Sequence, residues 1–463
     1  MLERVLIVGG GVSGLATAYF LSKAGIPSTI VEKANRLGGL IKTDLIEGCR
    51  LEAGPDSYIA SKPAVTELAR ELPVLAGQVM GSNDEARRIF VARGGKLVPM
   101  PKGMVMMVPG QWGPLLRSPL LSLGGKWRIL KETLSQPRHR AEDISVGRLV
   151  EDHFGHEVLE YLTEPLLCGV YGGDSANLSA QSVLPRFAGY EEKYGSLVKG
   201  IRREVREKPN GPMFLSLRDG MQALTDALSG AIADSTNVIH AEATHVERSS
   251  LGWRLKAGGA WLQASRLVLA CPAHAAGKLL QTEAAPLSAE LSAIPYSSAI
   301  LAMLVYDRTA LDHPLDGFGF LVPQAERKTI AAATWINTKF PSRLPAGRAA
   351  LRGFIVGEEA HRLLNVPQAE IIARVREDFR RFMGITSTPL FSTVHFWPDS
   401  MPQYVVGHNR RQQSILKLLG GYPGLGLVGN AYDGVGVPDC VRRAKELVKQ
   451  IAEPGVYVAE RYE

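Results

Sequence analysis

The sequence predicts an α/β fold in which a parallel β-sheet is assembled from both ends of the chain, with α+β segments inserted between its parts. Residues 4–8 (RVLIV) form the short aliphatic run of a buried parallel strand, and a glycine-rich loop and a helical pattern follow at once. Residues 424–428 (GLGLV) begin the same order of strand, loop and helix near the other end of the chain. These two units, with a long stretch between them, predict one discontinuous domain with insertions.

The composition is that of a large globular protein. The chain has 463 residues, of which 45% are hydrophobic and 21% charged, which excludes intrinsic disorder and a small disulfide scaffold. The net charge of +7 is scattered, with no Lys/Arg run of the kind that binds nucleic acid. Cys49, Cys168, Cys271 and Cys440 are far apart and show no C-x-x-C spacing, so we expect neither a zinc site nor disulfides, and a reducing compartment.

The first glycine-rich loop has the spacing G-x-G-x-x-G. It consists of Gly9, Gly10, Gly11, Val12, Ser13 and Gly14. Gly9 allows the tight turn, Gly11 lets the backbone approach a pyrophosphate, and Gly14 lets the helix pack closely on the strand. The helix N-terminus then offers free N–H groups to the phosphates. Glu32 ends the next strand, where its carboxylate can accept hydrogen bonds from a ribose diol. This order of elements predicts a Rossmann-like dinucleotide site.

The stretch after Glu32 identifies the dinucleotide. Lys33 is followed by Arg36 and then by the glycine pair Gly38-Gly39, which an NAD site does not need. This stretch resembles the E-x(3)-R-x-G-G extension of the flavin amine oxidase superfamily, whose loop lies along the pyrophosphate and ribityl chain of FAD. The resemblance implies that Arg36 supplies charge and planar donors to a phosphate. The alternative is an arginine exposed on a loop.

Two more loops belong to the same pattern. The turn formed by Gly54, Pro55, Asp56 and Ser57 brings N–H groups and short polar side chains together, and in this superfamily the equivalent loop passes the flavin ring. Residues 429–440 form a glycine-rich loop that opens a helix at about 438–451. The positive end of that helix would face the N1–C2=O edge of a flavin. Asn430 is a candidate partner for the ribityl or pyrophosphate region.

Longer stretches resemble the oxygen-dependent porphyrinogen oxidases of haem synthesis. These stretches are LVPMPKG (97–103), EPLLCGVYGGD (164–174), LSAQSVLPRF (178–187), RDGMQALTDAL (218–228), FWPDSMPQYVVGH (396–408) and YDGVGVPDC (432–440). The resemblance implies an FAD domain of the para-hydroxybenzoate hydroxylase type, a substrate domain with an antiparallel sheet, and a helical domain with a potential membrane-facing side. The implied boundaries are 1–80 with 215–280 and 405–463 for the FAD domain, 81–95 with 281–404 for the substrate domain, and 96–214 for the helical domain.

The resemblance also implies site residues. The implied FAD contacts are Gly9 to Gly14, Glu32, Lys33, Arg36, Gly39, Gly54, Pro55, Asp56, Ser57, Val246, Trp397, Asn430, Val435, Gly436 and Val437. Val246 lies in a strand-like stretch over the adenine, and Trp397 begins a loop near the flavin. Lys102, Arg186 and Arg218 are candidate partners for substrate propionates, although single basic residues are usually just solvated.

The implied reaction removes six electrons from a porphyrinogen as three hydrides, with oxygen as the acceptor and hydrogen peroxide as the second product. No residue is assigned as a general base, because aromatisation drives the loss of protons. Coproporphyrinogen III and protoporphyrinogen IX are both candidate substrates. The stretch LVPMPKG (97–103) favours the first, but only weakly. The alternatives are another FAD oxidase of this fold acting on amines or carotenoid-like polyenes, and a flavin-free scaffold that binds tetrapyrroles.

Location and partners are expectations of the same kind. The uncharged run 103–116 is broken by prolines and flanked by Trp and Lys/Arg, so it fits a membrane interface, a substrate-pocket wall or an ordinary core under a loop. We expect a cytoplasmic enzyme, with a potential peripheral contact at the inner face of the cell membrane and hand-over of the product to ferrochelatase. His153, His156 and Glu157 lie close together, but no further ligand follows at a useful spacing, so no metal is expected.

Overall fold

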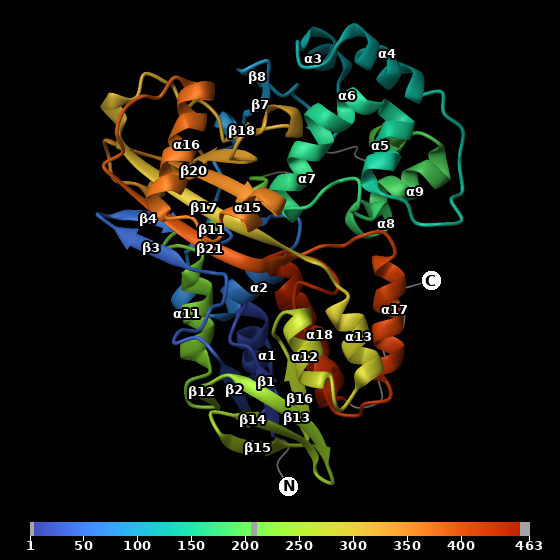
Figure 1. The fold of residues 1–463 in the computed structure, drawn as a ribbon, viewed down its shortest axis with the longest axis vertical. Helices are drawn as coiled ribbons and strands as arrows, with labels where there is room; N and C mark the ends of the chain where they lie inside the picture. The colour runs from blue at the N-terminus through green and yellow to red at the C-terminus, as the bar shows by residue number, and fades with distance from the viewer. Residues whose placement is uncertain (1–3, 205–210, 454–463) are drawn as a thin grey trace.

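The computed structural model describes residues 4–204 and 211–453. The ends of the predicted segments 1–80 and 405–463, and part of 96–214, therefore lie outside the described residues. The molecule is elongated, with a parallel sheet and its covering helices in one half and a larger sheet beside a group of helices in the other (Figure 1). This mixture of a parallel sheet, an antiparallel sheet and helices confirms the predicted fold class.

The parallel sheet joins strands from distant parts of the chain. Its order is β12 (Thr236–His240), β2 (Ser28–Glu32), β1 (Val5–Val8), β16 (Arg266–Leu269) and β22 (Leu425–Leu427), and all neighbours are parallel. Successive side chains of β1 enter two different cores, because Val5 and Ile7 lie on one face and Leu6 and Val8 on the other. Both faces are therefore buried, as the aliphatic run at 4–8 predicts.

Helices cover one face of this sheet, and a small sheet with further helices covers the other (Figure 1). The first face packs against α1 (Val12–Lys23), α2 (Ala64–Glu71), α11 (Gln222–Ala231) and α18 (Val437–Ala452). The second face packs against β13 (Ala243–Ser249), β14 (Gly252–Ala257), β15 (Ala260–Ala264), α12 (Ala273–Leu280), α13 (Ala285–Ser292) and α17 (His408–Leu419). The loops at the carboxyl ends of β1 and β2 are left free to carry a site.

The larger sheet has seven strands, and only its β18–β7 pair is parallel. Its order is β21 (Phe391–Pro402), β17 (Tyr296–Asp307), β20 (Arg348–Val356), β19 (Ala332–Trp335), β18 (Gly319–Leu321), β7 (Ile89–Arg93) and β8 (Lys96–Pro99). The helix α16 (Gln368–Met383) packs its apolar side on one face, and α14 (Ile336–Lys339) and α15 (Gly357–Leu363) lie at the ends of strands. Because β8 is the second strand of a hairpin with β7, residues 96–99 lie in this sheet rather than with the helices.

Two short β-sheets lie next to the parallel sheet and the seven-stranded sheet. The β3–β4 hairpin (Thr43–Ile46, Cys49–Glu52) lies beside the larger sheet (Figure 1). The strands β5 (Tyr58–Ile59), β11 (Phe214–Leu217) and β6 (Val79–Gly81) form a second small sheet. The segment that joins β4 to β5, residues 53–57, therefore passes between the two halves of the molecule.

The remaining helices surround their own apolar core. They are α3 (Trp112–Arg117), α4 (Leu123–Glu132), α5 (Val146–Phe154), α6 (His156–Val158), α7 (Glu164–Tyr171), α8 (Ala180–Val183), α9 (Pro185–Tyr194) and α10 (Leu197–Glu204), with the short hairpin β9–β10 (Met104–Val105, Val108–Pro109). Met107, Val108 and Leu115 are buried in this core. The uncharged run 103–116 is therefore core only in part, since Met106 and Leu116 are exposed. No helix of residues 4–204 or 211–453 is long and apolar enough to cross a bilayer.

A buried ion network lies inside the helical core. His153 contacts Glu132 through Nδ1 at 2.9 Å and Glu191 through Nε2 at 3.2 Å, and Arg140 binds Glu191 at 2.6 Å. His156 instead pairs with Glu151 on the surface. The histidines therefore do not converge, and no group of three or more His, Cys, Asp and Glu in the described part of the chain is arranged to hold a metal.

This network predicts a pH dependence of stability. Burial alone would lower the pKa of His153, but its hydrogen bonds to Glu132 and Glu191 outweigh burial and raise the pKa above 6.5. Stabilisation by the protonated ring is therefore complete below pH 6.5 and is lost as the pH rises through the higher folded value. We expect the melting temperature to fall as the pH rises across that range. His153→Gln should abolish this step, whereas His156→Gln, at an exposed ring, should keep it; an unchanged step in His153→Gln would contradict the assignment.

Candidate active site

The first glycine-rich loop is shaped by close contacts at two glycines and by open space at a third. Gly9 has φ +109°, and a Cβ there would lie 2.8 Å from the Ala270 carbonyl oxygen. A Cβ on Gly14 would lie 1.9 Å from the Gly9 carbonyl oxygen, so the close packing predicted for Gly14 is observed. A Cβ on Gly11 would meet nothing closer than the Gly39 Cα, at 3.9 Å. Space for a ligand therefore lies over Gly11.

The start of α1 is available to an anion. Gly11 is its N-cap and has no side chain to satisfy the first-turn N–H groups, and the first turn contains no acidic residue. Glu32 lies beside this helix end at the carboxyl end of β2. Its carboxylate accepts hydrogen bonds from Gly10 N at 2.6 Å and from Ala34 N at 2.8 Å, which fixes its position. The pairing of a positive helix end with an adjacent acceptor fits a phosphate next to a ribose.

Arg36 holds its own loop together. Its guanidinium donates to the carbonyl oxygens of Leu37 and Ile41, each at 3.1 Å, and also to that of Gly39. These bonds close residues 36–41 into a turn, whose Gly39 lies against Gly11. The structure thus gives Arg36 a role in shaping the loop, while its predicted phosphate contact remains a prediction. The side chain of Lys33 is exposed at the edge of the same loop.

The loop 53–57 lies directly on the 36–41 turn. A Cβ on Gly54 would lie 1.8 Å from the Leu40 carbonyl oxygen, so only glycine fits. Trp397 Nε1 donates to the Ala53 carbonyl oxygen at 2.6 Å, which brings the larger sheet to this loop. Trp397 lies within the twelve-residue strand β21, so the prediction that it begins a loop is wrong. The succession from Gly11 through the 36–41 turn to Gly54 forms a continuous surface of closely packed backbone.

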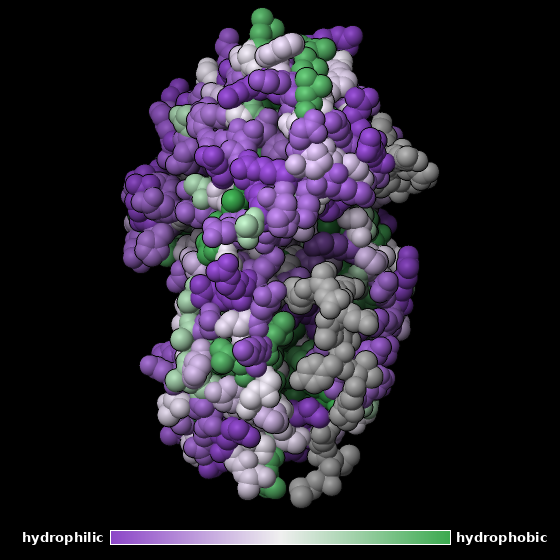
Figure 2. Space-filling view, turned by 90° about the vertical axis from the view of Figure 1, so that its right-hand side faces the viewer, coloured by the Kyte–Doolittle hydropathy of each residue, from purple (hydrophilic) through white to green (hydrophobic). Residues whose placement is uncertain are grey.

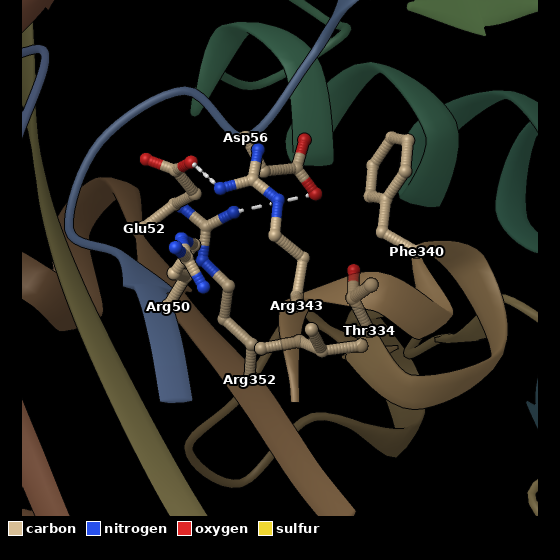
Figure 3. A pocket seen from close by; sticks show the side chains of 8 residues that line it. Arg50, Glu52, Asp56, Thr334, Phe340, Arg343 and Arg352 are labelled. Atoms are coloured by element: carbon tan, nitrogen blue, oxygen red, sulfur yellow. Dashed lines mark hydrogen bonds and ion pairs between the residues drawn. The ribbon is translucent and has the colours of Figure 1, made fainter. Parts of the chain in front are cut away.

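The carboxylate of Asp56 turns toward the larger sheet. Lys339 Nζ lies 2.8 Å from Asp56 Oδ2, and Arg352 Nη1 lies 3.6 Å from the same oxygen. Burial alone would raise the pKa of Asp56, but Lys339 and Arg352 outweigh it and hold the pKa well below its usual range. Figure 3 shows Asp56 facing Arg352, with the buried pair Glu52–Arg343 (2.5 Å) beside them.

The second glycine-rich loop ends at the start of α18. Gly436 is the N-cap, and Asp439 Oδ2 accepts from Gly436 N at 3.2 Å. Lys62 in turn binds Asp439 at 2.7 Å. A carboxylate therefore lies in the first turn of the helix that the sequence predicts to be positive, and Lys62 compensates its charge.

The stacked side chains of Tyr404 and His408 contact the backbone of this second loop. The Tyr404 hydroxyl donates to the Asn430 carbonyl oxygen at 2.8 Å, and the Tyr404 ring stacks on His408 with centroids 3.9 Å apart. His408 Nε2 lies 3.2 Å from the Tyr432 carbonyl oxygen. Burial lowers the pKa of His408 to about 4, so the ring is neutral and Nε2 can donate this bond. Val435 packs against the helical core and Tyr432 against the core of the parallel sheet, so this loop lies between these two parts of the fold.

Comparison with known proteins accounts for these loops. The model of a family described as flavin containing amine oxidoreductase matches residues 12–452. The chain belongs to this family. It is 30% identical over 464 residues to the Coproporphyrinogen III oxidase of Bacillus subtilis (strain 168), with 96% of this chain and 97% of that protein covered.

Two further similarities extend over nearly the whole chain. The chain is 29% identical over 483 residues to the chloroplastic Protoporphyrinogen oxidase of Oryza sativa subsp. japonica, covering 97% of this chain and 88% of that protein. A crystal structure from Exiguobacterium sp. 255-15, assigned as a protoporphyrinogen oxidase, has a TM-score of 0.88 and 30% identity. That structural match covers 98% of this chain and 99% of the other.

As a member of the flavin-containing amine oxidoreductase family, the chain is an FAD-dependent oxidoreductase. Its loops fit that cofactor. The open side of Gly11 leaves room for a pyrophosphate, the first turn of α1 offers N–H groups, and Glu32 offers a fixed acceptor for a ribose. The side chain of Val246, on β13, is buried in the core that the β13–β15 sheet shares with the parallel sheet, so its predicted adenine contact remains a prediction.

The three candidate propionate partners lie apart. Lys102 is exposed in the turn before β9, Arg186 donates to the Tyr190 hydroxyl from α9, and Arg218 is exposed after β11. Within the described residues no contact joins any two of them. They remain predictions as binding residues, without a shared pocket to support them.

Sequence reasoning missed the residues that hold the loops from outside. Lys339, Arg343 and Arg352 belong to no motif, and each acts on a segment almost three hundred residues away in the chain. Tyr404 and His408 lie in the stretch FWPDSMPQYVVGH, which the sequence marks as specific without assigning roles inside it. That stretch was therefore the sequence signal that could have pointed to Tyr404 and His408.

Proposed function

We propose that this chain oxidises a porphyrinogen to the corresponding porphyrin in haem biosynthesis. The observation that carries the proposal is similarity over nearly the full length to proteins named for this reaction, combined with loops that fit FAD. The balanced reaction is one porphyrinogen plus three O₂ giving one porphyrin plus three H₂O₂. Coproporphyrinogen III and protoporphyrinogen IX have the same methylene bridges, so the same chemistry serves either macrocycle.

The residues of this chain bind and orient the reactants. Bound FAD supplies the two-electron acceptor that an oxidation of carbon requires. The amides at the start of α1 and the Glu32 carboxylate would hold its phosphates and a ribose, and the loop 53–57 and the loop before α18 would contact the rest of it. No acid–base pair is needed, because the aromatic product stabilises proton loss. The chief contribution of the protein is therefore positioning.

Anaerobic mixing tests the substrate class. Purified enzyme saturated with FAD should lose its visible flavin absorbance on addition of coproporphyrinogen III or protoporphyrinogen IX, and an amine such as putrescine should leave the absorbance unchanged. Rapid bleaching by the amine with none by either porphyrinogen would overturn the proposal in favour of the amine or polyene alternative.

We further propose that a cytoplasmic form of this enzyme contacts an anionic membrane through α4 and the turn that follows it. Leu123 and Trp127 of α4 are 84% and 67% exposed and lie four residues apart, on one side of the helix, and Leu134, in the turn after α4, is 75% exposed. Arg128 and Lys131 are exposed on the same helix. Figure 2 shows hydrophobic side chains at the end of the molecule where Figure 1 places α3 and α4. An apolar stripe flanked by cations is typical of helices at membrane interfaces.

Trp127→Glu should weaken this contact. Co-sedimentation with phosphatidylglycerol vesicles should fall at least about tenfold, since a large apolar side chain no longer enters the interface. The matched control is Trp261→Glu, because Trp261 is 39% exposed at the opposite end of the molecule, on β15. Equal vesicle binding by both variants would contradict the proposal. Binding of ferrochelatase to the stripe, lost in Trp127→Glu without any vesicle binding, would assign the stripe to product hand-over instead.

A further inference from the structure

The loop between β4 and β5 is held mainly by residues outside the sheet that carries the glycine-rich loop. The Ala53 carbonyl oxygen accepts from Trp397 of β21, and the Gly54 carbonyl oxygen accepts from Arg352 of β20. The Asp56 carboxylate accepts from Lys339 of α14 at 2.8 Å. Three consecutive anchoring points of this loop thus depend on the seven-stranded sheet and the helix that follows β19.

The anchoring cations have little freedom. The Arg352 side chain is 3% exposed and that of Lys339 is 11% exposed, and Lys339 Nζ also lies 4.9 Å from the ring centroid of Phe214. Arg352 Nε is buried and has no hydrogen-bond partner among the described residues, so within the loop this cation is stabilised by the Gly54 carbonyl and the Asp56 carboxylate, with the Phe354 ring 4.6 Å from its guanidinium. Moving the loop would leave a buried charge without a partner, which is costly.

We propose that Lys339 and Arg352 are positioning residues for FAD, and that the Asp56–Lys339 pair sets the charge of the loop that faces the flavin. The proposal rests on FAD binding at the glycine-rich loops. The loop lies on the turn 36–41, which lies on Gly11, so a shift at Asp56 reaches the cofactor surface through closely packed backbone.

Removing Lys339 and removing Asp56 should shift the flavin midpoint potential in opposite directions. Lys339→Met leaves the Asp56 carboxylate without its nearest cation, so the flavin should become harder to reduce and its midpoint potential should fall. Asp56→Asn leaves Lys339 as an excess cation, so the potential should rise. Asp56→Asn/Lys339→Met restores the balance, and its potential should return toward that of the parent. A merely structural role would shift both single variants in the same direction.

The experiment measures flavin midpoint potential by redox titration with FAD at saturating concentration, and FAD affinity by titration of the apoprotein. Lys339→Met should raise the FAD dissociation constant about fivefold or more, and Lys339→Arg should restore most of the affinity. Arg348→Met is the matched control, because Arg348 also lies on β20 and pairs with Glu47 of the β3–β4 turn, but on the exposed side at 3.4 Å. Its affinity and potential should equal those of the parent.

The outcomes separate this proposal from the proposed function. If the parent protein binds no FAD, the cofactor assignment itself fails. If the parent binds FAD, and Lys339→Met and Asp56→Asn keep the parental potential or shift it in the same direction, the positioning role is wrong while the reaction stands. If Lys339→Met does not fold, the sign of the Asp56→Asn shift alone decides, and an unchanged or lowered potential overturns the proposal.

Discussion

Gly11→Ala is expected to give a folded protein that no longer retains FAD. The backbone of Gly11 has φ −71°, which alanine adopts freely, and the new Cβ would meet no protein atom closer than 3.9 Å. The methyl group would instead occupy the space in which the cofactor approaches the backbone. We expect the FAD dissociation constant to rise at least about tenfold, measured by fluorescence titration of the apoprotein.

Two other glycine substitutions serve as controls for Gly11→Ala. Gly230→Ala, on α11, also places a Cβ in open space but far from the glycine-rich loop in the sequence, and it should leave FAD affinity unchanged. Gly14→Ala drives a Cβ to 1.9 Å from the Gly9 carbonyl oxygen, so it should lower both the melting temperature and the affinity. Parental FAD affinity in Gly11→Ala would show that the cofactor does not lie over Gly11.

Arg343→Met is expected to produce the largest loss of stability among the charged residues of the site. The Arg343 side chain is 2% exposed, and it donates to Glu52 at 2.5 Å and to the Ser216 hydroxyl at 2.6 Å. Its removal leaves the Glu52 carboxylate buried without its cation. Removing one partner of such a pair costs about 3–5 kcal/mol. Urea unfolding of the FAD-free protein should show this loss as a lower midpoint.

Arg50→Met provides the control for Arg343→Met. Arg50 lies near Arg343 in Figure 3, but it pairs with Asp219 at 3.1 Å, and the two side chains are 33% and 52% exposed. Exposed pairs contribute about 0–1 kcal/mol, so this midpoint should hardly move. Glu52→Gln/Arg343→Met should recover part of the lost stability, since the unpaired charge is gone. A parental midpoint in Arg343→Met would contradict the role of this pair.

The local parts of the site were predictable from the sequence. The loop 9–14, the acidic residue at 32 and the helix that starts near 438 each depend on neighbours within a few dozen residues. Glycine spacing and strand patterns report such neighbours directly. The assembly of one parallel sheet from residues 5–8 and 425–427 followed as well, because the same pattern occurs twice.

The contacts between the two sheets were not predictable in this way. Lys339 and Arg352 look like any basic residues on a short helix and a strand, and only the fold brings them to Asp56. The family resemblance implied that Trp397 begins a loop, but pairing with β17 keeps it in a long strand. Proline is tolerated there because β21 is the edge strand of its sheet. Asp439 was read as part of a loop motif rather than as the acid that caps α18.

The central claim is tested most directly by an aerobic assay of the purified FAD-bound protein with each porphyrinogen, following porphyrin fluorescence and hydrogen peroxide together. The account predicts turnover of coproporphyrinogen III or protoporphyrinogen IX, with three peroxides for each porphyrin formed. The favoured macrocycle then identifies the substrate. Protein that retains FAD and forms neither porphyrin nor peroxide from either compound would contradict the account.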